Sequence, residues 1–117
     1  MDSSRPELKP GDRLRFLEPN GERNNWWDVR HEGERYTILT RQADFKPKGE
    51  VFYTIIDWLR ELGTLAHRGP CNLVGGGYDP YMGDVAVAGL ARDLADGDLE
   101  VSHRNRVPVV IREVQRA

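Results

Sequence analysis

The chain has 117 residues, 31% of them charged, and a formal net charge of −2. A chain of this length forms one domain with a core of its own, and its near-neutral charge excludes a global basic field that would attract nucleic acid or an anionic membrane. The first residues do not resemble a signal peptide, and no apolar run approaches the roughly 20 residues of a membrane helix. The single cysteine, Cys71, cannot form an internal disulfide. We therefore expect a cytoplasmic protein without a membrane partner.

The N-terminal half reads as a series of strands. Residues 1–11 are polar and contain proline, so they are expected to form a flexible arm ahead of a single domain at 12–117. Apolar and polar residues then alternate between turn signals, which is the pattern of β-strands. This pattern predicts strands at 13–18, 25–31, 35–41 and 51–58. The second and third are expected to pair as a hairpin, and the fourth is apolar on both faces, which is typical of a central strand covered from both sides.

The C-terminal half contains the one convincing helix, predicted at 81–95 because Val87, Leu90 and Leu94 form an apolar stripe. Gly97 is a natural end for it. The other segments read as a helical turn or strand extension at 59–65, a loop rich in Gly and Pro at 67–81, and strands at 99–103 and 107–114. The chain therefore predicts an α+β fold, with a five- or six-stranded, mostly antiparallel bent sheet or small open β-barrel and one main helix.

Two neighbouring tryptophans are the most informative feature. Side chains of adjacent strand residues point to opposite faces, so Trp26 and Trp27 cannot both enter one core from the same side. One is expected to fill the core while the other lies in a groove, under a helix or against a partner. Because aromatic residues and Arg dominate interface energetics, the predicted partner-binding residues are Trp26, Trp27, Arg41, Phe45 and Tyr78.

Charge is segregated along the chain. Residues 79–100 contain five Asp, one Glu and one Arg, a local net charge of −5. Basic residues interleaved with aromatic ones suit single-stranded nucleic acid, and the candidate nucleic-acid contacts are Arg41, Lys46, Lys48, Arg104 and Arg106. A surface with two poles of charge suits a protein partner equally well, so both alternatives stay open.

No pattern of catalytic residues is convincing. Ser102 and His103 are adjacent on a predicted strand, so their side chains point apart and are badly placed to share a proton in a triad with Asp57 or Asp98. His67 and Cys71 are separated by Gly-Pro, which is incompatible with a helix that would bring both to one metal ion. The sequence therefore predicts no catalytic residues, no metal site and no cofactor.

The glycine-rich loop leaves one further alternative. Gly75–Gly77 lacks the Lys-Ser/Thr of a phosphate-binding P-loop and is read as a tight loop or hinge. A small-molecule binder or enzyme that uses residues 68–81 would instead need a concave pocket containing several polar groups, such as His67, His103 and Asp57.

Four segments together carry a resemblance: Asn-Trp-Trp-Asp-Val-Arg at 25–30, Arg-Tyr-Thr-Ile-Leu-Thr-Arg-Gln at 35–42, Arg-Gly-Pro-Cys-Asn at 68–72 and Ser-His-Arg-Asn at 102–105. Over residues 10–114 the chain resembles small proteins of phages and prophages of high-GC actinobacteria, a group with no activity or catalytic residues to transfer. The resemblance implies a phage accessory protein that acts in the host cytoplasm. The 14 Arg against 3 Lys are compatible with such a host.

These observations favour a non-enzymatic accessory protein that binds a host macromolecule, in the first place a host protein, through an aromatic and arginine surface. The alternatives are a small β-barrel that binds RNA or single-stranded nucleic acid, and the small-molecule binder or enzyme described above. Pro108 indicates that the last strand begins at a sheet edge. Because a free edge can pair with a second copy, the chain is expected to be a monomer or a homodimer.

Overall fold

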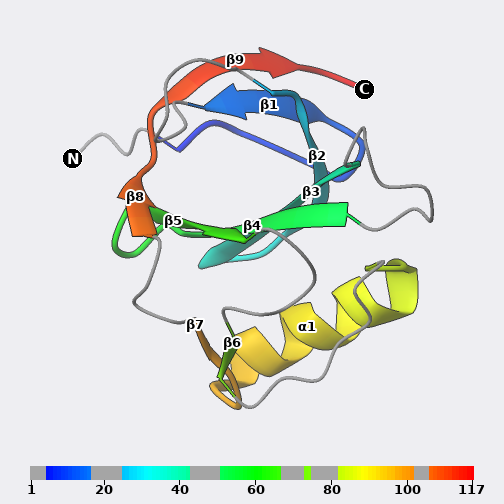
Figure 1. The fold of residues 1–117 in the computed structure, drawn as a ribbon, viewed down its shortest axis with the longest axis vertical. Helices are drawn as coiled ribbons and strands as arrows, with labels where there is room; N and C mark the ends of the chain where they lie inside the picture. Colours follow the sequence, from blue (N-terminus) through cyan, green and yellow to red (C-terminus); the bar gives the residue numbers. More distant parts are fainter. Residues whose placement is uncertain (1–4, 17–24, 43–50, 67–72, 75–81, 102–105) are drawn as a thin grey trace.

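The computed structural model describes residues 5–16, 25–42, 51–66, 73–74, 82–101 and 106–117 (Figure 1). In chain order its elements are β1 (Arg13–Phe16), β2 (Trp27–Glu32), β3 (Tyr36–Gln42), β4 (Val51–Asp57), β5 (Leu62–Ala66), β6 (Leu73–Val74), α1 (Asp84–Asp96), β7 (Glu100–Val101), β8 (Arg106–Pro108) and β9 (Ile111–Gln115).

Seven strands form one antiparallel sheet in the order β8-β5-β4-β3-β2-β1-β9, and β6 and β7 form a separate antiparallel pair. The strands at the two ends of this order, β8 and β9, are separated in the chain only by Val109 and Val110. Because such a link spans at most about 11 Å, the two ends of the sheet must lie close together. The sheet therefore curls into a small open barrel, with α1 packed on its outside (Figure 1).

The expected α+β class, with an antiparallel, strongly bent sheet and one main helix, is confirmed. The sheet reaches seven strands because segment 59–65 adds β5 and the expected last strand is divided, whereas the strand expected at 99–103 is β7, which pairs with β6 outside this sheet. Its first part, β8, pairs with β5, and after a bend β9 pairs with β1. Segment 59–65 is likewise a turn followed by a strand, with Glu61 at a positive φ of 54°. Pro108 does lie on a strand at the end of the sheet order.

Two cores share the central strands. Leu39 and Ile56 belong to the cluster inside the barrel, whereas Ile38 and Ile55, their neighbours in the chain, belong to the cluster between the sheet and α1. All four side chains are at most 1% exposed. This confirms that β4 is a central strand covered from both sides, and β3 is covered in the same way.

The helix presents the predicted stripe to the sheet. Its buried residues are Val87, Leu90, Ala91 and Leu94, and it ends at Gly97, which has the left-handed φ of 79°. The first turn begins at Asp84, three residues later than the sequence predicted. The Asp84 carboxylate forms a 2.8 Å ion pair with Arg30 of β2. The apolar stripe therefore holds the helix on the barrel, while the ion pair, whose Asp84 side chain is 99% exposed, contributes little.

The N-terminal segment is packed where the structure describes it, which corrects the expected flexible arm at 1–11. Leu8 is 6% exposed and belongs to the core inside the barrel. The backbone N–H of Gly11 donates to the carbonyl of Val29 at 3.0 Å, and Arg5 forms a 2.9 Å ion pair with Glu32. The packed unit thus includes residues ahead of the predicted boundary at residue 12.

Candidate functional site

The two tryptophans separate as the alternation of strand side chains predicts. Trp27 is 2% exposed and packs inside the barrel, where its ring lies 5.6 Å from that of Phe16. Trp26 is only partly buried. Trp27, one of the predicted partner contacts, is thereby corrected to a core residue, because so buried a ring cannot touch a partner. Trp26 is the member of the pair that keeps accessible surface.

Two arginines of β1 lie against the Trp26 ring. The guanidinium carbon Cζ of Arg15 is 4.5 Å from the ring centroid and that of Arg13 is 5.5 Å away. Arg13 and Arg15 are two positions apart on one strand, so they share its outward face while Leu14 between them enters the core. The alternation of residues 13–16 is enough to place Arg13 and Arg15 on the face opposite Leu14, but no local pattern shows that they gather on Trp26.

Each of these arginines also has a carboxylate neighbour on an adjacent strand. Arg13 lies 3.3 Å from Asp28 of β2, and Arg15 lies 3.2 Å from Glu113 of β9. The two carboxylate side chains are 54% and 55% exposed, and ion pairs so exposed to water contribute about 1 kcal/mol or less. We call this surface, made of Arg13, Arg15, Trp26, Asp28 and Glu113, the Trp26 face. Its ion pairs are weak enough to exchange for pairs with another molecule.

The Trp26 face and the acidic helix lie on different sides of the molecule. Strands β1 and β9 are on the side of the barrel away from α1 (Figure 1). The helix side carries the described acidic residues of the segment 79–98: Asp84, Asp93, Asp96 and Asp98. This acidic cluster therefore lies away from the Trp26 face, on which two arginines and two carboxylates balance.

Arg41 points into one end of the barrel. It follows Leu39 by two positions on β3 and therefore shares the interior face. Its Cζ lies 4.7 Å from the ring centroid of Phe52 and 5.4 Å from that of Trp27. Arg41 was predicted as a contact for a protein or for nucleic acid, and the structure instead places it between two aromatic rings, away from the Trp26 face.

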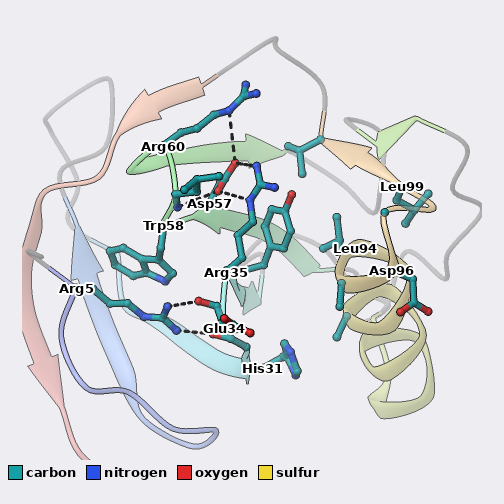
Figure 2. A pocket seen from close by; sticks show the side chains of 17 residues that line it. Arg5, His31, Glu34, Arg35, Asp57, Trp58, Arg60, Leu94, Asp96 and Leu99 are labelled. Carbon is teal, nitrogen blue, oxygen red and sulfur yellow. Dashed lines mark hydrogen bonds and ion pairs between the residues drawn. The ribbon is translucent and has the colours of Figure 1, made fainter.

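A polar cleft of about 880 Å³ lies between the barrel and the end of α1. Arg35 and Asp57 stand on the barrel side, and Leu94 and Leu99 stand on the helix side (Figure 2). The cleft also contains Arg5, whose guanidinium lies 5.3 Å from the Trp58 ring. Because it is assembled from the ends of several elements that are distant in the chain, no local pattern in the sequence could have indicated it.

Asp57 is held ionised in this cleft. Burial alone would raise the pKa of Asp57, but two 2.9 Å hydrogen bonds from the Arg35 guanidinium and one of 3.1 Å from the backbone N–H of Leu59 outweigh it. The pKa of this carboxyl therefore lies below its usual value. Of the three groups that the sequence offered for a catalytic pocket, Asp57 is the one described, and here it anchors the turn after β4.

Several predicted site residues fall outside the described residues: Phe45, Tyr78, Lys46, Lys48, Arg104, His67, Cys71, Gly75–Gly77, Ser102 and His103. Arg106 is described only in its backbone, which pairs with Thr64 in the sheet. Within the described ranges, no group of three or more His, Cys, Asp or Glu side chains is arranged to hold a metal ion. Those ranges also contain no helix long and apolar enough to cross a membrane.

Comparisons of the chain with protein-family models, with curated proteins and with solved structures found no match.

Proposed function

We propose that the chain is a non-catalytic binding protein and that it recognises a partner protein through the Trp26 face. The observation that carries this proposal is the separation of the two tryptophans: Trp27 completes the core, whereas Trp26 stays partly accessible with two arginines against its ring. Tryptophan and arginine are the residues most enriched among those that dominate binding energy at protein interfaces. The Trp26 face brings both types together on one outward surface.

The charges of the Trp26 face favour a protein over nucleic acid as the partner. Asp28 and Glu113 lie beside the two arginines, and a nucleic-acid backbone would bring phosphates against these carboxylates. A protein surface that carries both basic and acidic side chains around an apolar patch would pair with Asp28 and Glu113 as well as with Arg13 and Arg15, and would cover Trp26. The resemblance to phage proteins supports a host protein as this partner, in the host cytoplasm.

The test is affinity capture from an actinobacterial lysate, with and without nuclease, using the wild-type chain and two variants. Trp26→Ala removes the centre of the face. Val85→Ala is the matched control, because Val85 is also an exposed apolar residue, 89% exposed, but lies on α1. We expect a protein that survives nuclease, binds the Val85→Ala variant and is lost from the Trp26→Ala variant. Capture that disappears with nuclease would instead assign the face to nucleic acid.

The cleft supports a second candidate function, the binding of a small polar ligand. Its volume of about 880 Å³ falls in the range of ligand pockets, about 300–1,000 Å³. Ala95 lines the cleft from α1, so Ala95→Trp would fill it. A small molecule that raises the unfolding temperature of the wild type is expected to lose that effect in this variant. An unchanged effect would place the ligand elsewhere.

A further inference from the structure

Arg41 differs from the other partly buried arginines in the described part of the chain. Arg5, Arg15 and Arg30 each have a carboxylate within 3.2 Å. Arg41 has no such neighbour among the described residues, and its Nε is buried without a hydrogen-bond partner. Removing a guanidinium from water without a counter-charge is costly unless another group compensates it. Arg41 is therefore a partly buried cation without a counter-charge among the described residues, and a bound anion would compensate it.

The aromatic neighbours of Arg41 do not supply an oxygen acceptor for its N–H groups. The Cζ of Arg41 lies 4.7 Å from the ring centroid of Phe52 and 5.4 Å from that of Trp27. The N–H groups of a guanidinium lie in its plane and match two oxygens of one carboxylate or phosphate. Packing against the two rings also limits the rotamers of Arg41, which reduces the entropy lost when a ligand binds.

Two further polar atoms at the same end of the barrel interior lack partners. The indole Nε1 of Trp27 and the hydroxyl of Thr54 are buried without a hydrogen bond, and the two residues are 2% and 0% exposed. Thr54 follows Phe52 by two positions on β4 and so faces the same interior. Each unsatisfied buried group of this kind costs about 1–3 kcal/mol. An oxygen acceptor within reach of the indole N–H would remove this cost.

From these contacts we propose that the end of the barrel at Arg41 is an oxyanion site. Arg41 binds the carboxylate or phosphate group of a small ligand through its N–H edge, and the indole N–H of Trp27 is the second donor. Arg41 and Phe52 are only partly buried, so solvent reaches this end of the barrel. The site is separate from the Trp26 face, because Arg41 and Trp27 point inward, so each proposal can fail without the other.

The test follows the indole N–H signals of the three tryptophans by ¹H–¹⁵N NMR while phosphate, acetate or chloride is added. Trp58 is an internal control, because its Nε1 donates to the Thr37 hydroxyl at 2.7 Å. We expect the Trp27 signal to shift and saturate with phosphate or with acetate, in the millimolar range expected for one charged group, while the Trp58 signal stays in place. The anion that saturates the shift identifies the ligand group.

Two arginine variants complete the test. Arg41→Gln should weaken the saturable shift at least about 10-fold, whereas Arg112→Gln, which removes one exposed positive charge from β9, should leave it unchanged. Native positions of the Trp26 and Trp58 signals report that each variant is folded. If Arg41→Gln does not fold, Arg41→Lys is used, because it keeps the charge but loses the planar guanidinium. The proposal is overturned if the wild-type Trp27 signal does not saturate, if chloride gives the same shift, or if folded Arg41→Gln or Arg41→Lys binds like the wild type.

Discussion

At the scale of single residues, Asp12 shows how one buried carboxylate joins the two ends of the described chain. It is 0% exposed and accepts hydrogen bonds from the backbone N–H of Ala117 at 3.0 Å and of Lys9 at 3.1 Å. Arg116 adds a third at 3.2 Å. The bond from Ala117 is the largest of the causes that hold the pKa of Asp12 below its usual value, against the opposing effect of burial.

A lowered pKa in the folded state makes stability depend on pH in a defined direction. The stabilisation from Asp12 is fully present above its unfolded pKa of about 3.9 and is lost as the pH falls through the lower folded value. Asp12→Asn should therefore destabilise the protein most at pH 7, and its difference from the wild type should shrink below about pH 4. Urea unfolding at several pH values measures this. A difference that stays constant from pH 7 to pH 3, or an equal loss in the exposed control Asp98→Asn, would contradict it.

The two tryptophans should differ sharply in their effect on stability. Trp27→Ala empties part of the barrel core and should lower the free energy of unfolding by about 3–5 kcal/mol. Trp26→Ala removes contacts with two arginines at a partly exposed site and should lower it by only about 1 kcal/mol. Urea unfolding of the two variants is the measurement. Equal losses would mean that the two rings are equally buried.

Residue alternation predicted some of these positions and not others. It separates Trp26 from Trp27 correctly, because the side-chain period of a strand is two residues. The same period places Arg41 on the interior face with Leu39, but the charge of Arg41 argued for an outward position. Two aromatic rings, Trp27 from β2 and Phe52 from β4, pack against Arg41 and allow this position. No local sequence pattern shows these contacts.

At the scale of elements, α1 combines features that sequence predicts well with one that it does not. The stripe that includes Val87, Leu90 and Leu94 and the stop at Gly97 follow from periodicity and glycine. At the start of the helix, Asp84 forms an ion pair with Arg30, which lies 54 positions earlier in the chain. The sequence predicted a start at residue 81, because periodicity alone does not show contacts with so distant a strand.

The two ends of α1 give a matched pair of glycine variants. Gly97 has a φ of 79° and Gly83 a φ of −63°, and an added Cβ would meet no atom within 4 Å at either position. Gly97→Ala should therefore cost about 1 kcal/mol from backbone conformation alone, whereas Gly83→Ala should change stability little. Thermal unfolding compares them. Equal effects would show that the left-handed end of the helix does not contribute to stability.

At the scale of the whole molecule, the C-terminal run closes the barrel. Strand β8 pairs with β5 and β9 pairs with β1, so β1 is an inner strand between β2 and β9. In the segment between β8 and β9, the backbone N–H of Val109 donates a hydrogen bond to the carbonyl of Glu61 at 3.0 Å. The sequence predicts a bent sheet or an open barrel, and the pairing of one divided strand with two distant partners selects the barrel.

Hydrogen exchange tests this closure without any substitution. We expect the amide protons of β1 and of Val109 to exchange as slowly as those of β3 and β4, since closure removes them from the sheet edge. The amide of Val85, in the unbonded first turn of α1, is the fast-exchanging comparison. If the β1 amides exchange as fast as that of Val85, β9 does not close the barrel in solution, and its edge would be available to a second copy.

Closure also separates two parts of the surface, with the acidic residues of α1 on one side and the Trp26 face on the other. A partner protein that binds this face should therefore be insensitive to changes on the helix. The most direct measurement is the affinity of the captured partner for the wild type, Trp26→Ala and Val85→Ala by calorimetry. We predict at least about 10-fold weaker binding for Trp26→Ala and unchanged binding for Val85→Ala. Wild-type affinity in folded Trp26→Ala would contradict the assignment of the Trp26 face.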